Sequence, residues 1–262
     1  MNKPDWFLFP RRLARPSLRL LCFPYAGSGA SLPVFRDWAK AMPDGVEVAV
    51  LELPGRGKRF GEPLIGSLLP LADRIAAEVS QMSAVPFVIF GHSIGALIGY
   101  EVVRSLIARR AALPELLIAS GKRAPHAPHP QRLHDLPAPE LIAALKDYNG
   151  TPDEVLRSPE LMDLFLPILR ADFSLAETYA HAHTASFGVP IHAMGGTGDS
   201  GVPEALLREW GRHTHGGFVS EMYPGDHFFI QGEARQQVLQ RVLQLVRARL
   251  PGVERLREVS AA

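Results

Sequence analysis

The stretch Phe87-Val88-Ile89-Phe90-Gly91-His92-Ser93-Ile94-Gly95-Ala96 decides the fold of this 262-residue chain. Its first four residues are apolar, which is typical of a strand that is covered on both faces. The pattern Gly-x-Ser-x-Gly follows directly, and a helical pattern begins at Ile94. Gly91 and Gly95 allow a strand and a helix to approach closely around a sharp turn. The stretch therefore predicts a strand, a tight turn that presents the Ser93 hydroxyl above the sheet, and a helix.

The rest of the chain repeats this alternation of apolar strands and helices. Strands are predicted at 18–23, 46–53, 87–90, 116–119, 190–194 and 218–223. Helices are predicted at 32–42, 68–82, 94–109, 204–213 and 233–250. Apolar strands that alternate with helices over short connections indicate a parallel sheet wrapped by helices. Together with the serine turn, the pattern predicts an α/β-hydrolase fold, with a mostly parallel central sheet flanked by helices.

One insertion breaks the alternation. It opens with Pro125-His126-Ala127-Pro128-His129-Pro130, a composition typical of a loop. Helical patterns without a strand then follow at 138–148, at 153–156 and, with breaks, at 159–179. The insertion separates the serine from its expected partners, so we interpret it as a lid over the active site. The alternative is a helical subdomain that only adds core. The predicted division is a hydrolase core of residues 1–124 and 186–262, with a helical lid insertion at 125–185.

Composition and charge exclude several classes of protein. The net charge is +1, from 28 basic and 27 acidic residues, which favours neither nucleic acid nor an anionic membrane as partner. Cys22 is the only cysteine, so an intramolecular disulfide is impossible and a reducing compartment is suitable. Arginines interrupt the N-terminal 20 residues, and no apolar run is long enough to cross a bilayer. We expect a soluble cytoplasmic protein, and nothing requires more than a monomer.

A serine hydroxyl needs a base to become a good nucleophile. In α/β-hydrolases the chain order is nucleophile, acid, histidine. His227 follows the last predicted strand in Pro224-Gly225-Asp226-His227 and is the expected base. Asp199 ends the glycine-rich run 195–199 after the preceding strand, and it is the expected acid that holds the imidazole tautomer. Asp226 is the alternative acid, but a sequence neighbour of the histidine usually faces away from it.

Other histidines suggest no second site. His192 lies inside a predicted strand and is interpreted as a packed residue. His213 and His215 are interpreted as the end of a surface helix, where the helix dipole favours histidine. His181 and His183 could suggest a metal, but no third ligand has usable spacing. We therefore expect neither a metal nor a bound cofactor.

Two backbone N–H groups are needed to form an oxyanion hole. One is expected from Ile94, the residue after the nucleophile. The other is expected from the loop 23–30 that follows the first predicted apolar strand, and Ala26 is our choice there. Removing one such donor typically costs about 3 kcal/mol of transition-state stabilisation.

Five separated motifs occur in order between about residues 20 and 230. They are Leu21-Cys22-Phe23-Pro24-Tyr25-Ala26-Gly27-Ser28, Leu53-Pro54-Gly55-Arg56-Gly57, Phe90-Gly91-His92-Ser93-Ile94-Gly95-Ala96, Ala119-Ser120-Gly121-Lys122-Arg123-Ala124-Pro125 and Gly225-Asp226-His227-Phe228-Phe229. Together these motifs resemble the stand-alone (type II) thioesterases of polyketide and nonribosomal peptide synthesis. The Pro-Gly-Arg and Ser-Gly-Lys-Arg-Ala-Pro segments are much more specific to this family than the serine turn is.

The resemblance implies hydrolysis of acyl thioesters held on the phosphopantetheine arm of an acyl or peptidyl carrier protein. The enzyme would remove stalled or misprimed acyl groups, bind its carrier partner transiently and need no cofactor of its own. Residue by residue, the resemblance assigns Ser93, Asp199 and His227 as the triad and Ala26 and Ile94 as the oxyanion donors. The insertion at 125–185 would correspond to the family's flexible lid.

The chain departs from the family pattern at three places. Tyr25 stands where many members have histidine, and Ile94 stands where methionine is common. The acid loop keeps only Asp199 of two aspartates that often occur there. These departures leave the triad intact, and they mean that substrate preference does not carry over from the family.

Three other functions are compatible with parts of this pattern. A carboxylesterase or lipase would use the same triad, and an acyltransferase would use it with an acceptor other than water. A non-catalytic binding module could retain the fold, although a complete triad argues against it. Carrier proteins are usually acidic, so basic residues are candidate contacts with a carrier; these are Arg104, Arg109, Arg110, Lys122 and Arg123. Arg104, Arg109 and Arg110 fit a solvated helix end better than a carrier contact.

Overall fold

The computed structural model describes residues 5–82, 84–128, 132–148, 150 and 153–250. Seven strands form one sheet in the order β1-β3-β2-β4-β5-β6-β7, and every neighbouring pair is parallel except β1 with β3. The predicted mostly parallel sheet is confirmed. The strands are β1 (Phe7–Leu8), β2 (Leu18–Phe23), β3 (Val46–Leu51), β4 (Phe87–His92), β5 (Leu116–Ser120), β6 (Ile191–Gly196) and β7 (Phe218–Tyr223).

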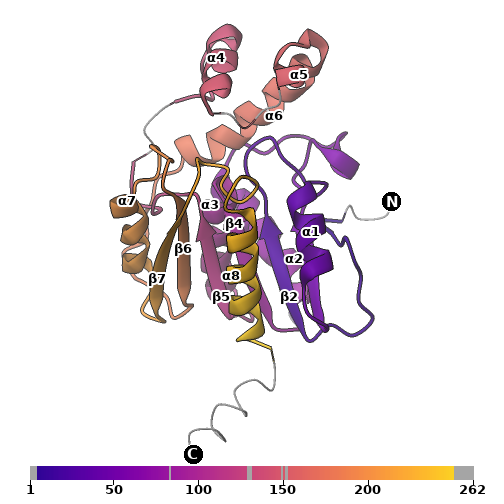
Figure 1. Ribbon diagram of the computed structural model, residues 1–262, viewed down its shortest axis with the longest axis vertical. Coiled ribbons are helices and arrows are strands. Elements are labelled where there is room, and N and C mark those ends of the chain that lie inside the picture. The colour runs from indigo at the N-terminus through magenta and orange to yellow at the C-terminus, as the bar shows by residue number, and fades with distance from the viewer. Residues whose placement is uncertain (1–4, 83, 129–131, 149, 151–152, 251–262) are drawn as a thin grey trace, which may run out of the picture.

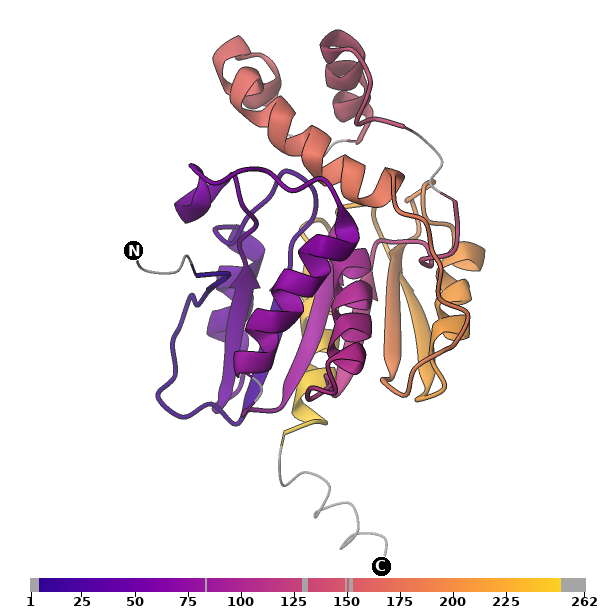
Figure 2. The same cartoon turned by 180° about the vertical axis from the view of Figure 1, so that it is seen from behind.

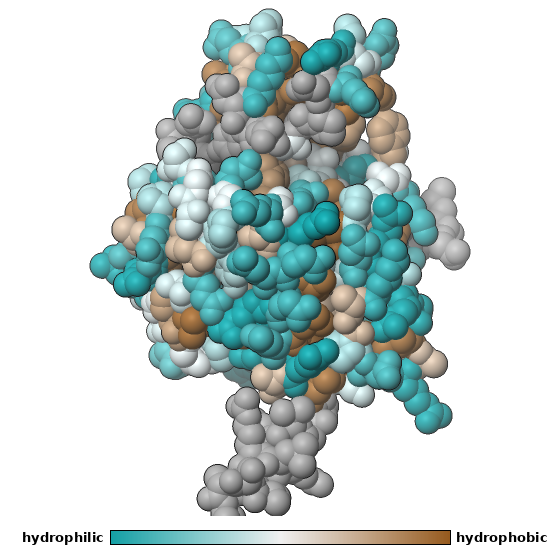
Figure 3. All heavy atoms as spheres, viewed as in Figure 1, coloured by the Kyte–Doolittle hydropathy of each residue, from teal (hydrophilic) through white to brown (hydrophobic). Residues whose placement is uncertain are grey.

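Helices cover both faces of the sheet, as Figures 1 and 2 show from opposite sides. Helices α1 and α8 lie on one face and α2 and α3 on the other. Figure 3 shows mostly hydrophilic residues on the outside of the first face, where α8 lies. The flanking elements are α1 (Pro33–Ala41), η1 (Gly57–Arg59), α2 (Leu68–Met82), α3 (Ile94–Ala108), α7 (Glu204–Arg208), η2 (Glu209–His213) and α8 (Arg235–Arg247).

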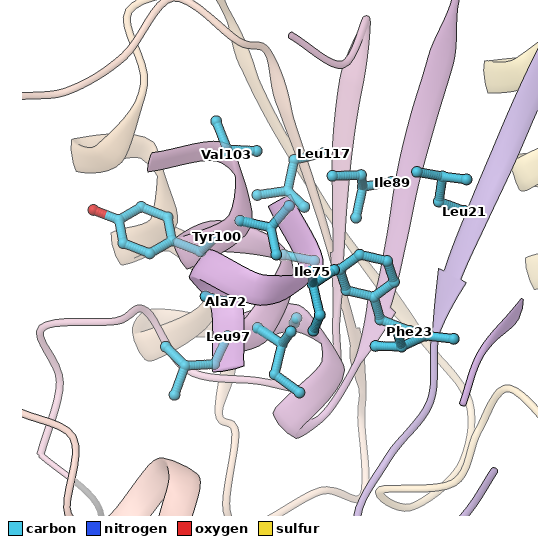
Figure 4. Packing of buried hydrophobic residues seen from close by; sticks show 14 of the residues in the cluster. Leu21, Phe23, Ala72, Ile75, Ile89, Leu97, Tyr100, Val103 and Leu117 are labelled. Atoms are coloured by element: carbon cyan, nitrogen blue, oxygen red, sulfur yellow. The ribbon is translucent and has the colours of Figure 1, made fainter. Parts of the chain in front are cut away.

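Each strand contributes side chains to two cores. In β2, Leu20 and Cys22 pack toward α1 and α8, whereas Leu21 and Phe23 pack toward α2 and α3. Figure 4 shows the second core, where Leu21 and Phe23 lie near side chains of α2 and α3. Because both faces are buried, the central strands are mostly apolar, with exceptions such as Arg19 of β2, Glu47 of β3 and His192 of β6.

The predicted strand-turn-helix around Ser93 is confirmed. β4 ends at His92, Ser93 adopts φ 56° and ψ −121°, and α3 begins at Ile94. A positive φ at a residue other than glycine costs about 1–3 kcal/mol, so the surrounding packing must hold it. A Cβ on Gly91 would lie 2.2 Å from the Gly95 carbonyl oxygen. The turn therefore depends on close backbone contacts that only glycine allows.

Replacing Gly95 with alanine is expected to destabilise the fold. The new Cβ would lie 2.0 Å from the Phe23 carbonyl oxygen, and the contacting atoms are all backbone. Alanine has a higher helix propensity than glycine, which stabilises the folded state by about 1 kcal/mol. We expect the overpacking penalty to exceed this gain, for a net loss of about 3 kcal/mol or more in the free energy of unfolding. Urea denaturation measures it. Gly61→Ala is the control, because nothing lies within 4 Å of its added Cβ. Equal stability of the two variants would contradict this account.

Three further helices form the insertion. They are α4 (Ala138–Tyr148), α5 (Asp153–Leu156) and α6 (Pro159–Glu177), and they lie beyond the carboxyl ends of the parallel strands in both ribbon views. They have a small core of their own, formed by Leu133, Leu141, Leu145, Met162 and Leu169. The bounds of α4 and α5 match the prediction. The predicted opening loop 125–130 is described only to Pro128, because His129 and Pro130 lie outside the described residues.

Several elements differ from the prediction. The antiparallel strand β1 was not expected, because two residues carry no periodic pattern. Helix α6 runs through Pro167 without the expected break, and the buried Ile168 and Leu169 that follow it show that packing outweighs the lost hydrogen bond. The predicted helix 204–213 is divided into α7 and the 3₁₀ turn η2. Across the described ranges, no helix is both long and apolar enough to pass through a membrane.

Candidate active site

The three predicted triad residues come together, with His227 within hydrogen-bond distance of both Ser93 and Asp199. Ser93 Oγ lies 3.0 Å from His227 Nε2, and His227 Nδ1 lies 2.6 Å from Asp199 Oδ2. Ser93 follows β4, Asp199 follows β6 and His227 follows β7. The carboxyl ends of parallel strands meet at one edge of a sheet, and this is why residues so far apart in sequence come together.

The loops after β6 and β7 hold each other in register. The Gly198 N–H donates to the Gly225 carbonyl at 2.8 Å, and a Cβ on Gly196 would lie 2.3 Å from the Asp226 carbonyl oxygen. The second oxygen of Asp199, Oδ1, accepts the Gly201 N–H at 3.0 Å. Both carboxylate oxygens of Asp199 are therefore fixed, and Oδ2 points at the imidazole of His227.

Asp226, the alternative acid, has another contact. Its Oδ1 accepts the Phe228 N–H at 2.8 Å, two residues farther along the chain. This local contact is the usual turn-forming role of aspartate. The structure thus places Asp199 against His227 Nδ1, in the position that the chain order predicts.

The two expected oxyanion donors lie on neighbouring segments, because a Cβ on Gly95 would lie 2.0 Å from the Phe23 carbonyl oxygen and 2.7 Å from that of Pro24. Ile94 is the first residue of α3. Ala26 lies in a turn closed by the Ser28 N–H donating to the Tyr25 carbonyl at 3.2 Å, with Gly27 at φ +75°. Among the described residues, no acceptor is found for the Ala26 N–H. That N–H is therefore available, and its role as an oxyanion donor remains a prediction.

A cavity of about 820 Å³ lies between the turn that carries Ala26 and the helices of the insertion. Phe165 and Leu169 of α6 line one side, and Tyr25 and Phe228 line the other. The rings of Tyr25 and Phe228 meet edge to face at 5.1 Å between centroids. The volume is in the range of small-molecule sites, and the apolar part of the lining suits an acyl chain.

His92 lies beneath this site, a placement that sequence reasoning did not assign. The side chain is fully buried, with Nδ1 2.9 Å from Ser120 Oγ, and its ring centroid lies 5.4 Å from that of His227. Burial lowers the pKa of His92 well below its ordinary value, so the ring is neutral. It therefore supports the His227 ring without adding a competing charge. His192 is also buried, as predicted.

The interpretation of His213 as the end of a surface helix is wrong. Its side chain is buried, and Nδ1 and Nε2 lie 3.1 Å from Tyr100 Oη and 2.8 Å from His126 Nδ1. Burial, with the nearby His181 and His126, lowers the pKa of His213 to about 3. Local sequence could not reveal this, because the residues that cover His213 come from other parts of the chain.

The pair that could have suggested a metal belongs to this same region. His181 Nε2 lies 3.2 Å from Tyr100 Oη, and His183 Nε2 lies 3.2 Å from Glu101 Oε2. In the described parts of the chain, no group of three or more His, Cys, Asp or Glu side chains is arranged to hold a metal ion.

The basic residues at the end of α3 lie far from Ser93. Arg109 pairs with Asp73 at 2.7 Å, just beyond the last turn of the helix. A helix of 15 residues separates this end from Ser93 by about 22 Å at 1.5 Å per residue. Arg104 packs over the rings of Tyr100 and Phe187. The surface-helix interpretation therefore fits Arg109 better than a role in carrier contact does.

The fold and the arrangement of the site are those of a serine hydrolase. The Thioesterase domain family matches residues 18–246. The chain is 39% identical to "Gramicidin S biosynthesis protein GrsT" of Aneurinibacillus migulanus, over 86% of this chain and 88% of that protein. It is 35% identical to "Thioesterase PikA5" of Streptomyces venezuelae, over 83% of this chain and 77% of that protein. The chain therefore belongs to the thioesterase family.

Solved structures narrow this to the type II thioesterases. The thioesterase RedJ from the prodiginine pathway of Streptomyces coelicolor superposes with a TM-score of 0.81 at 33% identity, over 90% of this chain and 96% of RedJ. YbtT, a type II thioesterase of the yersiniabactin pathway, superposes with a TM-score of 0.82 at 27% identity, over 95% and 99% of the two chains. The family that the five motifs predicted is confirmed.

Proposed function

We propose that Ser93, His227 and Asp199 are the catalytic triad of a thioesterase that acts on acyl groups bound to carrier proteins. The observation that carries this proposal is the chain of two hydrogen bonds from Ser93 Oγ through His227 to Asp199. The cavity beside Ala26 supplies a place for the acyl group. The relatives act in peptide and polyketide pathways by their names, which favours a phosphopantetheine thioester in such a pathway as substrate.

The first half of the reaction forms an acyl-enzyme. His227 Nε2 takes the proton from Ser93 Oγ, which attacks the thioester carbonyl carbon. The developing oxyanion accepts hydrogen bonds from the N–H groups of Ala26 and Ile94. The carbon–sulfur bond then breaks, and the proton on His227 passes to the departing thiolate. Asp199 keeps the imidazole in the required tautomer and stabilises its charged form.

The second half releases the acid and restores the enzyme. A water molecule takes the place of the thiol, and His227 Nε2 removes its proton as it attacks the acyl-serine carbonyl. The same two N–H groups hold the second oxyanion. The ester bond to Ser93 Oγ breaks, the serine recovers its proton from His227, and the free carboxylic acid leaves.

The insertion at 125–185 forms the wall of the cavity that would contact the acyl chain. Its residues Val155, Phe165 and Leu169 line the cavity opposite the core residues Tyr25 and Phe228. We therefore assign α4, α5 and α6 the role of a lid that covers the bound acyl chain. The triad supplies the whole reaction without a cofactor, and the carrier protein is needed only for the duration of delivery. A monomer in the cytoplasm, where the buried Cys22 thiol is compatible with a reducing medium, completes the proposal.

The thioesterase should prefer a carrier-bound thioester to an oxygen ester of the same acyl group. We expect kcat/KM to favour the thioester by at least about tenfold, since the site would discriminate by transition-state contacts worth about 1.4 kcal/mol or more. Steady-state kinetics with one acyl group on a carrier protein, on free pantetheine and as a simple ester measures this. Mass spectrometry of the product separates hydrolysis from acyl transfer. Preference for the oxygen ester, or an acylated acceptor in place of free acid, would overturn the proposal.

A further inference from the structure

A buried ion pair joins the lid helix α6 to the segment after β3. The two guanidinium nitrogens Nη1 and Nη2 of Arg56 lie 2.6 and 2.7 Å from the two carboxylate oxygens of Asp172. Only 8% of the Arg56 side chain and 2% of the Asp172 side chain are exposed. This two-point contact needs the planar fork of arginine, which lysine does not have.

The same two side chains hold two points of the turn that carries Ala26. Asp172 Oδ2 accepts the Gly27 N–H at 2.7 Å, and Arg56 Nη1 donates to the Ser28 carbonyl at 3.0 Å. Ala26 and Gly27 are the two central residues of this turn. Fixing the Gly27 N–H and the Ser28 carbonyl fixes the orientation of the turn, and with it the direction of the Ala26 N–H.

Two neighbouring contacts support the same loop. Leu169, one turn before Asp172 on α6, packs against Gly27, where an added Cβ would lie 2.6 Å from Leu169 Cδ2. Glu52 Oε1, just after β3, accepts the Ala30 N–H at 3.1 Å. The loop is therefore held on one side by α6 and on the other by the segment that contains the Pro-Gly-Arg motif.

Stability alone gives little reason for such a pair. Well-packed apolar residues can often replace a buried ion pair without loss of stability, because desolvation offsets the attraction between the charges. The two hydrogen bonds to the loop are a contribution that apolar residues cannot make.

We propose that Arg56 and Asp172 are positioning residues for the oxyanion loop, which is the loop 23–30 that carries Ala26. They hold this loop in its active shape and link that shape to the position of α6 against the core. This inference rests on the proposed function, because it takes Ala26 as an oxyanion donor. When α6 lies against the core, Asp172 holds Gly27 and the Ala26 N–H faces the reacting carbonyl. When α6 moves away, the turn loses that acceptor and the oxyanion hole loses its geometry.

The variant Asp172→Asn tests this inference. Both carboxylate oxygens of Asp172 accept hydrogen bonds, so the amide nitrogen of asparagine must face a donor on Arg56 or on Gly27. We expect kcat to fall by about 10–100-fold, less than the loss of a whole oxyanion donor, with KM changed by less than about threefold.

A boronic acid that mimics the acyl group provides a second readout. It forms a tetrahedral adduct with Ser93 Oγ and places an oxygen in the oxyanion hole, so its affinity should fall by the same factor as kcat/KM. A merely structural role would lower the thermal midpoint without producing this proportional loss.

The matched control is Glu47→Gln. Glu47 is likewise buried, with Oε2 2.9 Å from Arg19 Nε and Oε1 accepting the Leu13 N–H at 2.8 Å. It lies at the start of β3, at the edge of the sheet opposite the site. We expect this control to lose stability as Asp172→Asn does, and to keep the kcat and boronate affinity of the wild type.

Equal kcat and boronate affinity in Asp172→Asn and Glu47→Gln would overturn the inference. If Asp172→Asn does not fold, the double variant Arg56→Met/Asp172→Leu replaces it, since it removes both charges and keeps an apolar packing. This protein should fold and show the same loss of kcat and of boronate affinity; wild-type values would overturn the inference. Failure of the proposed function is a separate result, because it is measured on the wild type, which would then prefer the oxygen ester, form an acylated acceptor or fail to hydrolyse the carrier-bound thioester.

Discussion

Ser93→Ala is expected to hydrolyse carrier-bound thioesters about 10⁶-fold more slowly than the wild type, as loss of the nucleophile does in other serine hydrolases. Alanine leaves His227 without a hydroxyl to deprotonate, and the acyl-enzyme cannot form. Binding of the acylated carrier should be retained, because neither the cavity lining nor the insertion is altered. Single-turnover measurements at saturating enzyme record the chemical step alone.

Ser105→Ala is a suitable control for this experiment. Ser105 lies in the last turns of α3, where its hydroxyl donates to Asp73 at 2.8 Å, far from the triad. It should keep full activity and should still allow a fluorophosphonate to label Ser93, whereas Ser93→Ala should not be labelled. A Ser93→Ala protein that keeps a tenth or so of the wild-type turnover would contradict the proposed mechanism.

Asp199→Asn is expected to lower kcat by about 10⁴-fold, as the corresponding change does in other Ser-His-Asp enzymes. In the wild type, the Asp199 carboxylate lies 2.6 Å from His227 Nδ1 and can only accept a hydrogen bond from it. An asparagine amide can donate there, which would leave the Nε2 proton on the side of Ser93 and prevent the ring from acting as a base. Steady-state kcat with a carrier-bound thioester measures the effect.

Asp226→Asn serves as the comparison in the same assay. Asparagine can still accept the Phe228 N–H that Asp226 accepts now, so the turn should persist. We expect kcat within about tenfold of the wild type, since no tautomer is altered. A larger loss in Asp226→Asn than in Asp199→Asn would reverse the assignment of the acid.

Much of the fold could be predicted because its strands are buried on both faces and its turn around Ser93 has a local signature. The central strands are short, mostly apolar runs, and the glycines beside Ser93 mark the close approach of β4 and α3. The chain order of Ser93, Asp199 and His227 could be predicted because parallel strands bring their carboxyl ends to one edge of the sheet. Strand β1 could not be predicted, because two residues pairing with β3 show no periodicity.

The contacts that hold the turn beside Ala26 could not be predicted from local sequence. Asp172 lies 116 residues from Arg56, inside a helix whose polar residues look like those of any amphipathic helix. Its burial depends on how α6 crosses the core. The burial of His213 could not be predicted for the same reason, since contacts with residues distant in sequence, such as His126 and Tyr100, place it inside the protein.

Phe165, Leu169 and Asp172 follow one another at spacings of four and three along α6, so they share one stripe of the helix. Phe165 and Leu169 line the cavity, and Asp172 accepts a hydrogen bond from Gly27 in the turn beside Ala26. A change in the position of this face of α6 is therefore expected to alter both the chain-length preference and the turnover. A redesign of the cavity for longer or bulkier acyl groups through α6 is expected to change selectivity and turnover together.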